Sequence, residues 1–248
     1  MAYQNTFKRY EIKYLIDKAS RDALLQVMNR YMCLDEYGHS LICNIYYDTP
    51  QKLLVRRSLE KPDYKEKFRI RSYGVASLTS PVYMEIKKKY DGVVYKRRVD
   101  TTEWEAVNYM NRDRAISKKN QVTDEIDYFK KHYKGLEPAM YISYEREAFY
   151  GKEDRELRIT LDENILYRED DLSLASKPYG KSLLKKDTYL MEIKVAGAMP
   201  LWLVKALSEL KIYRTSFSKY GFAYMETLKE NKEDSFGKYE ETGGLIYA

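Results

Sequence analysis

The chain has 248 residues, of which 44% are hydrophobic and 33% are charged, with 44 Lys and Arg against 38 Asp and Glu. This length suits one large domain or two small ones with a sizeable core, and no apolar run is long enough for a membrane-spanning helix. The N-terminal segment lacks the apolar run of a secretory signal, so we expect a cytoplasmic protein.

Alternating apolar and polar residues predict eight strands, in chain order at 7–16, 41–48, 66–74, 81–90, 93–100, 139–150, 156–163 and 187–195. Apolar residues at helical spacing predict helices over 18–32, 102–110, 121–132, 200–211 and 217–230. Thr102, with Glu105 three positions later, has the spacing of a capping box. Asp91-Gly92 predicts a tight hairpin between two of the strands. We expect a single domain over 1–230 and a loose polar C-terminal tail over 231–248.

The direct hairpin breaks the regular strand and helix alternation that a parallel sheet requires. The sequence therefore predicts the α+β class, with eight antiparallel strands closed into a β tunnel or barrel and helices packed outside it.

Charged residues share one face of most predicted strands, because side chains alternate between the two faces of a strand. In Lys67-Phe68-Arg69-Ile70-Arg71 three cations occupy one face and two apolar residues occupy the other. The same alternation groups Arg9, Glu11 and Lys13; Glu85, Lys87 and Lys89; Lys96 and Arg98; Arg158, Thr160 and Asp162; and Glu192 and Lys194.

For any one strand, the simplest interpretation is a solvated charged face above an apolar core. Six such strands together favour another interpretation, because cationic strands would repel their like-charged neighbours unless an anion lay between them. Glu11, Glu85, Glu192 and Asp162 lie among these cations. They can be ion-pair partners, or they can hold Mg²⁺ or Mn²⁺ chelated by a polyphosphate.

Other chemistries have little support in the sequence. His39 and His132 form no ligand pair, and Cys33 and Cys43 lack metal-binding spacing. We find no glycine-rich phosphate loop, no Ser/His/Asp arrangement and no RNA-binding motif, so we expect no nucleic-acid partner. Without an evident nucleophile, any catalysis must depend on positioning and electrostatic stabilisation, which phosphoryl transfer permits.

An ordered set of motifs resembles the VTC polyphosphate-polymerase domain, within the triphosphate tunnel metalloenzyme superfamily. The resemblance covers about residues 7–225, and each motif is weak alone. The motifs are Arg9-Tyr10-Glu11-Ile12-Lys13-Tyr14, Tyr46-Tyr47-Asp48-Thr49, Lys67 to Gly74, Glu85 to Lys89, Lys96-Arg97-Arg98, Tyr144 to Phe149, Arg158 to Asp162, Leu190 to Lys194 and Phe217-Ser218-Lys219-Tyr220.

The resemblance implies a closed eight-stranded tunnel in which the γ-phosphate of ATP, or of another nucleoside triphosphate, passes to a growing polyphosphate chain with Mn²⁺ or Mg²⁺. Together with the strand faces, it predicts catalytic roles for Arg69, Arg71, Lys87, Arg146 and Lys219. It predicts substrate-binding roles for Lys13, Lys67, Lys89, Lys96, Arg98, Arg158 and Lys194. Glu192 is the principal predicted metal ligand, and Glu85 is a weaker candidate.

One position departs from the hydrolytic members of the superfamily, which begin with Glu-x-Glu-x-Lys. In this sequence Arg9 occupies the position of the first Glu, which argues against hydrolysis and fits the polymerase branch. The membrane segments of eukaryotic VTC chains are also missing from this sequence. We therefore expect any coupling to translocation to need a separate membrane protein, which would hold the domain at the inner face of the membrane. A triphosphatase or tripolyphosphatase and a non-catalytic polyphosphate-binding module remain as alternatives.

Overall fold

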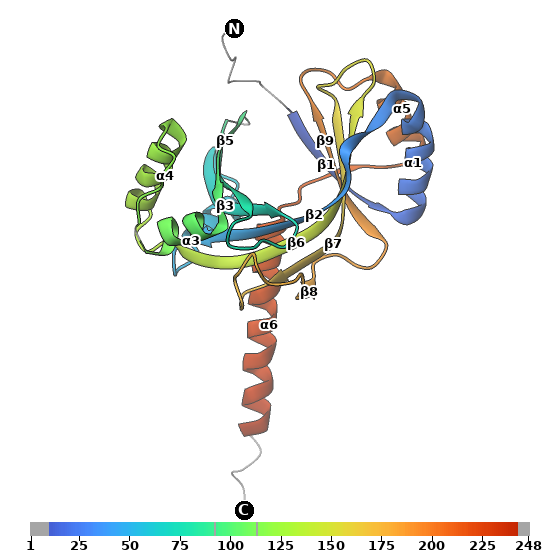
Figure 1. Ribbon diagram of the computed structural model, residues 1–248. Coiled ribbons are helices and arrows are strands. Elements are labelled where there is room, and N and C mark those ends of the chain that lie inside the picture. The colour runs from blue at the N-terminus through green and yellow to red at the C-terminus, as the bar shows by residue number, and fades with distance from the viewer. Residues whose placement is uncertain (1–9, 92, 113, 243–248) are drawn as a thin grey trace, which may run out of the picture.

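The computed structural model describes the backbone of residues 10–91, 93–112 and 114–242, and side chains up to residue 231 (Figure 1). The strands are β1 (Tyr10–Asp17), β2 (Met32–Asp48), β3 (Tyr64–Tyr73), β4 (Pro81–Tyr90), β5 (Val93–Thr102), β6 (Glu137–Gly151), β7 (Arg158–Arg168), β8 (Lys181–Ser182), β9 (Thr188–Val195) and β10 (Arg214–Thr215). The helices are α1 (Lys18–Tyr31), α2 (Leu53–Leu59), α3 (Glu103–Asn111), α4 (Gln121–His132), α5 (Leu201–Glu209) and α6 (Lys219–Thr242). All eight predicted strands are present, and the α+β class is confirmed.

The strands form one antiparallel sheet in the order β10-β1-β9-β7-β6-β2-β3-β4-β5, with β8 beside β7. The predicted closure into a barrel is not confirmed. In the described part of the chain, the hydrogen-bonded ladder ends at β5 on one side and at β10 on the other. The short strand β10 occupies the outer edge of β1, opposite Lys13 and Tyr14. The sheet therefore curls into two facing arms, one of β3 to β5 and one of β9 and β1 (Figure 1).

Helices cover the backs of both arms. Phe68 and Ile86 pack against Phe129 of α4 in one buried cluster, which also contains residues of α3. On the other arm, Met191 lies in a cluster with Leu24 of α1 and Leu203 of α5. Because side chains alternate along each strand, burying the apolar residues under these helices turns the charged residues toward the space between the arms.

The helix α2 was not predicted, because it has only seven residues and no capping side chain directly before it. Its cap is Asp48, which lies at the end of β2. The Asp48 carboxylate accepts hydrogen bonds from the backbone N–H groups of Leu54 and Val55 at 2.8 and 3.0 Å, and from the Tyr220 hydroxyl of α6 at 2.9 Å. Asp48, which belongs to one of the family-like motifs, thus holds α2 and α6 together.

The hairpin signal is reproduced, and the capping-box signal is reproduced in part. Thr102 caps α3 by accepting from the Glu105 N–H, but the Glu105 carboxylate accepts from Thr101 and Ser117 and does not complete a capping box. Strands β4 and β5 form the predicted hairpin, with Asp91 at φ 43°, while Gly92 lies outside the described residues.

The C-terminal segment differs from its prediction. Helix α6 continues to Thr242, so residues 231–242, expected as a loose tail, are helical. This segment is rich in Lys and Glu, which are good helix formers. Within the described ranges, no helix combines the length and apolar character needed to cross a membrane.

Candidate functional site

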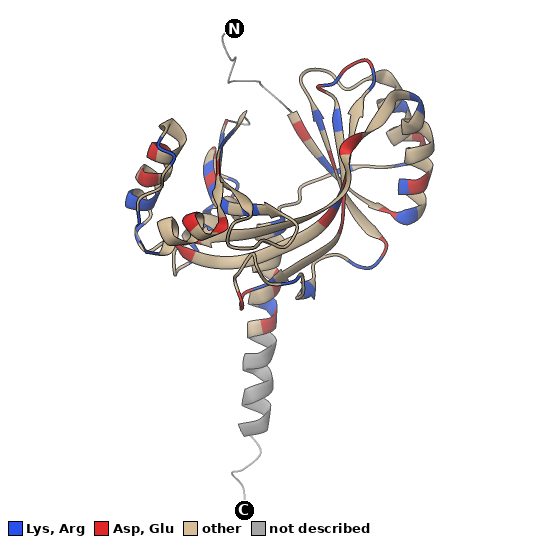
Figure 2. Cartoon of the chain, in the orientation of Figure 1, with Lys and Arg blue, Asp and Glu red and all other residues tan. Residues whose placement is uncertain are grey.

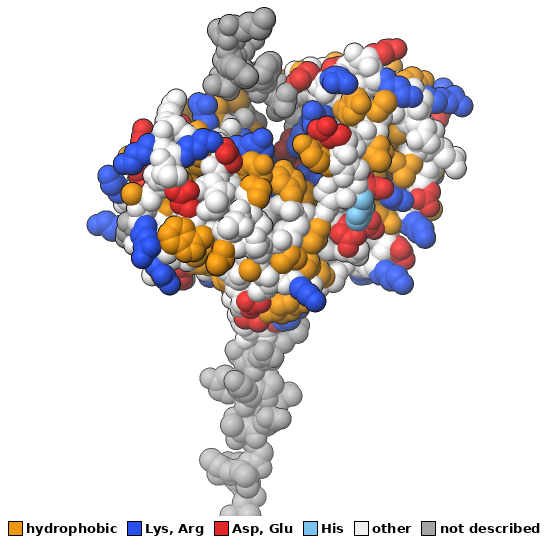
Figure 3. Space-filling model, viewed as in Figure 1, with side chains coloured by type: hydrophobic (Ala, Val, Ile, Leu, Met, Phe, Trp, Pro, Cys, Tyr) orange, Lys and Arg blue, Asp and Glu red, His pale blue; other side chains and the backbone are white. Residues whose placement is uncertain are grey.

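Lysines lie directly opposite one another in the arm formed by β3, β4 and β5. Lys65 is paired with Lys89 and Lys67 with Lys87 across the β3–β4 ladder, and Lys87 is paired with Lys96 across the β4–β5 ladder. Like charges directly opposite in a sheet are destabilising. Figure 2 shows Lys and Arg on the strands of both arms, and Figure 3 shows a hollow between the arms with Lys and Arg at its wall.

Glu85 forms the centre of a first ion-pair cluster on this arm. It contacts Arg69 at 2.8 Å, and it also contacts Lys96 and, at 3.9 Å, Arg71. Burial alone would raise the pKa of Glu85, but Arg69, Arg71 and Lys96 hold it well below its ordinary value. Burial lowers the pKa of Lys96 to about 8, and the nearby arginines act in the same direction while Glu85 opposes them.

Asp162 and Glu192 form a second cluster, on β7 and β9. Arg146 donates to both Asp162 oxygens at 2.5 and 2.7 Å, and Lys219 at the start of α6 also contacts Asp162. Lys13, Lys219 and Arg146 surround Glu192 at 3.1, 3.7 and 3.8 Å. Burial would raise the pKa values of both acids, but Arg146 and Lys219 lower both, and Lys13 further lowers that of Glu192. Both carboxylates are therefore ionised at neutral pH.

Tyr144 connects the two clusters. Its hydroxyl accepts from Arg71 at 3.0 Å, and the Lys219 ammonium lies 4.3 Å from its ring centroid. Burial would raise the pKa of Tyr144, but Arg71, Arg146 and Lys219 lower it to about 8. Three cations thus surround Tyr144 in the space between the arms.

Lys67 is a buried cation in this space with little compensation. Its ammonium donates to the Ser218 hydroxyl at 2.7 Å, and among the described residues it has no ion-pair partner within 4 Å. Burial lowers the pKa of Lys67 to about 7, and Lys87, Lys13, Lys65 and Arg69 act in the same direction. An anion bound here would restore the charge of this lysine.

Side chains bridge the two ends of the open sheet. Lys87 of β4 contacts Glu11 of β1 at 3.2 Å. The Lys13 ammonium lies between two acids, 3.4 Å from Glu11 and 3.1 Å from Glu192. Burial would raise the pKa of Glu11, but Lys87 and then Lys13 help lower it to about 2, while Glu192 opposes them.

The carboxylates of Glu11 and Glu192 fit a divalent metal. Both are oxygen donors in contact with the Lys13 ammonium, and hard divalent cations such as Mg²⁺ and Mn²⁺ prefer carboxylate oxygens. Glu85 is less accessible for this role, because its side chain is 2% exposed, against 10% for Glu192 and 20% for Glu11.

The remaining predicted residues lie toward the ends of the site or outside it. Lys89 is exposed at the end of β4, and Arg98 lies over the Tyr83 ring at 4.9 Å. Lys194 lies next to Glu192, and burial lowers its pKa. Arg158 points instead to Asp35 at 3.7 Å, with 54% of its side chain exposed. Arg9 lies outside the described residues.

Several members of the site were not among the predicted site residues. Asn44 and Tyr46 accept from Arg71 and Arg69, both at 2.9 Å, and Ser218 accepts from Lys67. Asp162 and Glu11 were recognised among the cations of the strand faces as possible ion-pair partners or metal ligands, and Tyr144 belongs to a recognised motif. Tyr46 and Ser218 also belong to recognised motifs, whereas Asn44 carries no comparable signal, because polar residues are also common in strands.

Comparison with known proteins agrees with this architecture. The VTC domain family matches residues 8–227. This chain belongs to the VTC domain family. The resemblance inferred from the ordered motifs is therefore confirmed. No curated protein matches the sequence.

Two solved structures share the fold of this VTC domain. A Bacillus halodurans protein assigned as an adenylate cyclase has 15% identity and a TM-score of 0.54, over 85% of this chain and 95% of that one. An assigned adenylyl cyclase from Hippeastrum, described as having a dominant triphosphatase activity, has 17% identity and a TM-score of 0.50, over 86% of this chain and 93% of that one. At these identities the likeness concerns the fold.

Proposed function

We propose that this VTC domain is a metal-dependent polyphosphate polymerase, which transfers the γ-phosphate of ATP or another nucleoside triphosphate to a growing polyphosphate chain. The observation that carries the proposal is the row of lysines placed directly opposite one another, Lys65 with Lys89 and Lys67 with Lys87. A bound polyanion along this row removes their repulsion. Membership of the VTC domain family supports the same substrate class.

The residues between the arms suit phosphoryl transfer, which needs positioning and charge stabilisation more than covalent catalysis. Lys67 and Lys87 bind non-bridging phosphate oxygens, and Lys89 and Lys194 extend the cationic surface for further phosphates. Arg69 and Arg71 are held in place by Glu85, Tyr46, Asn44 and Tyr144, so they can stabilise the transferring group without reorganising.

In the proposed reaction, a terminal oxygen of the acceptor polyphosphate attacks the γ-phosphorus of the nucleotide. The bond between that phosphorus and the β–γ bridging oxygen breaks, and the nucleoside diphosphate leaves with the electron pair. Arg146 and Lys219, next to Glu192, neutralise charge on the transferring phosphoryl group. Glu192 and Glu11 would hold Mn²⁺ or Mg²⁺, which supplies further charge neutralisation when bound.

The proposed partners are the nucleotide and polyphosphate, without nucleic acid. We also propose a cytoplasmic location, with a separate membrane protein where synthesis is coupled to translocation. A triphosphatase is the second candidate function, favoured by the triphosphatase activity described for the structurally similar Hippeastrum protein.

Incubation of the full chain with γ-labelled ATP and Mn²⁺, with and without a polyphosphate primer, tests the proposal. Polymerase activity gives labelled polyphosphate of increasing length, with one ADP released for each phosphate transferred. Labelled orthophosphate with ADP would identify a triphosphatase and contradict the proposal. Binding of polyphosphate without turnover of ATP would identify a binding module and also contradict it.

A further inference from the structure

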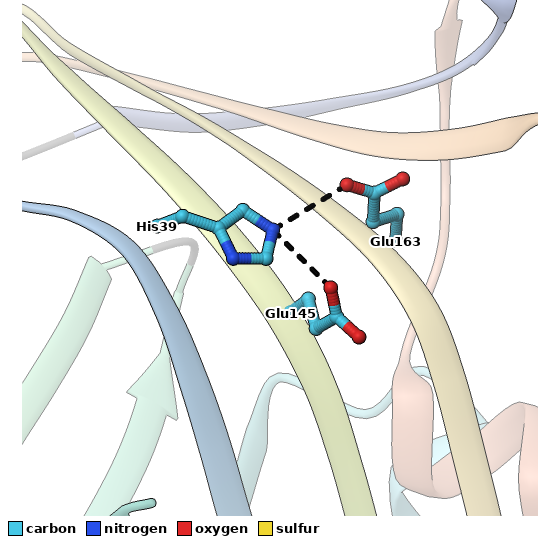
Figure 4. A group of neighbouring side chains, drawn as sticks. All are labelled: His39, Glu145 and Glu163. Carbon is cyan, nitrogen blue, oxygen red and sulfur yellow. Dashed lines mark ion pairs between the residues drawn. The ribbon is translucent and has the colours of Figure 1, made fainter.

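A second group of metal-ligating side chains lies on the opposite face of the sheet from Arg146. His39 of β2, Glu145 of β6 and Glu163 of β7 come from three adjacent strands, and Figure 4 shows them pointing toward one another. Leu41 and Glu145 are paired across the β2–β6 ladder, next to the pair of Ser40 and Arg146. Because neighbouring residues alternate in direction, Glu145 faces away from the proposed phosphate site.

Two of the donor-atom distances in this group match those between ligands of one metal ion. The His39 Nε2 atom lies 3.3 Å from a Glu145 carboxylate oxygen and 3.5 Å from a Glu163 oxygen, and all three donor atoms lie within 4.8 Å of one another. Metal bonds of about 2.1 Å that meet at a tetrahedral angle separate their donor atoms by about 3.4 Å. The three side chains are therefore close to a ligating arrangement.

The two glutamates also need a cation between them. Glu145 and Glu163 are directly opposite each other in the β6–β7 ladder, where like charges repel. A register shift in this ladder lies between Ser143 and Glu145, and Asn164 has φ 49° beside it. The Asn164 amide donates to the Glu145 carboxylate at 3.2 Å. Such a hydrogen bond orients a ligating carboxylate in many metal sites.

A cavity and an unpartnered hydroxyl at the same place provide an independent indication of a ligand. The cavity has a volume of about 230 Å³, and its lining includes His39, Ser143, Glu145 and Asn164. Ser143 is 1% exposed, and its hydroxyl has no hydrogen-bond partner of good geometry within the described residues, although the Tyr141 hydroxyl lies near it. A water molecule bound to an ion in this cavity would satisfy such a hydroxyl.

We propose that His39, Glu145 and Glu163 bind a divalent transition metal of the Zn²⁺ type, separate from the proposed phosphate site. Zn²⁺ accepts both imidazole nitrogen and carboxylate oxygen as ligands, and three protein ligands leave a coordination position open to the cavity. The ion links β2, β6 and β7 on the back of the strands that carry Tyr144, Arg146 and Asp162.

Crystals of the tag-free full chain soaked in ZnCl₂ test this site directly by anomalous scattering at the zinc edge. The expected result is a peak within bonding distance of His39 and both glutamates, which is absent from crystals of His39→Ala. The peak should persist in Glu36→Gln, which changes an exposed glutamate of β2 outside the group, and in Glu192→Gln, which changes the proposed phosphate site. A wild-type crystal without a peak at His39 would overturn the proposal.

Titration with Zn²⁺ and thermal unfolding give a second test that does not need crystals. His39→Ala and Glu163→Gln should each weaken this site at least about tenfold, because each removes a ligand. In EDTA, Glu163→Gln should unfold at or above the wild-type temperature, since it relieves the repulsion from Glu145, and it should lose the increase that Zn²⁺ gives the wild type. If Glu163→Gln unfolded at a lower temperature than the wild type in EDTA, and Zn²⁺ did not raise the unfolding temperature of the wild type, the group would be an ordinary ion pair and the metal site would be contradicted.

Discussion

Lys67 of β3 and Lys87 of β4 are directly opposite each other in the sheet, and only one of them has an acid partner in the described part of the chain. Lys87 contacts Glu11 across the open ends of the sheet at 3.2 Å, whereas Lys67 contacts the Ser218 hydroxyl. Burial and the neighbouring cations therefore disfavour the charged form of Lys67. This unfavourable arrangement is explained if the natural state of the site contains a bound anion.

The variant Lys67→Met should be more stable than the wild type without ligand, and should bind tripolyphosphate more weakly. Removing one member of a like-charged cross-strand pair should raise stability by roughly 0.2–1 kcal/mol, or up to about 4 °C in melting temperature for a chain of this length. Loss of a charge-assisted contact should cost about 1.5–3 kcal/mol of binding free energy. Thermal unfolding and calorimetric titration measure both effects, and a variant that is less stable yet binds normally would contradict this role.

Binding of tripolyphosphate should take up protons. The pKa of Lys67 is about 7 in the empty protein, and bound phosphate should move it toward the ordinary value for lysine. The bound state then holds more protons than the free state, so affinity should fall as pH rises from about 7 toward 10. Calorimetry at pH 8 in buffers of different ionisation enthalpy measures this uptake. Lys67→Met should take up fewer protons, and equal uptake by both proteins would exclude Lys67 as the source.

The period-2 pattern predicted much of this arrangement. It placed Lys67, Arg69 and Arg71 of β3 on one face of the sheet. It placed Lys88 of β4 on the other face, where Lys88 contacts Glu125 of α4. These predictions succeed because the pleat of a strand fixes side-chain direction whatever the neighbouring strands do.

Sheet closure and the contacts between distant segments could not be predicted in this way. Closure depends on strand stagger and tilt, which strand number does not determine. Lys219 reaches Asp162 because α6 is anchored through Tyr220 and Asp48, a tertiary contact with no local signal. The register shift in the β6–β7 ladder likewise interrupts the alternation that predicts faces.

Arg69→Ala should weaken tripolyphosphate binding, while Lys88→Ala should leave it unchanged. Arg69 lies on the face between the arms beside Glu85 and Tyr46, and Lys88 lies on the opposite face of the neighbouring strand. The expected loss for Arg69→Ala is roughly 1.5–3 kcal/mol, measured by calorimetric titration at fixed ionic strength. Equal losses from both variants would mean that net charge, and not this face of the sheet, determines binding.

Glu192→Gln should abolish most turnover of ATP with Mn²⁺ while it preserves the fold and anion binding. The amide keeps the size of the side chain but lacks the charge that a divalent cation requires, so the rate should fall more than the affinity for tripolyphosphate. Metal-titrated activity and circular dichroism measure the two properties.

Glu85→Gln is the matched control for this variant, because Glu85 is also buried among cations and contacts Arg69 and Lys96. It should retain the Mn²⁺ concentration dependence of the wild type. A Glu192→Gln protein with wild-type metal titration, or a Glu85→Gln protein with a strongly shifted one, would remove Glu192 from its assigned role.

A crystal structure of the full chain with Mn²⁺ and a non-hydrolysable ATP analogue tests the central claim most directly. The account predicts the triphosphate between the arms, with phosphate oxygens at Lys67, Arg69 and Arg146, and anomalous density for Mn²⁺ at Glu192. The same structure would contradict the account if the triphosphate lay elsewhere and the ion pairs of Glu85, Asp162 and Glu192 remained as they are in the empty protein.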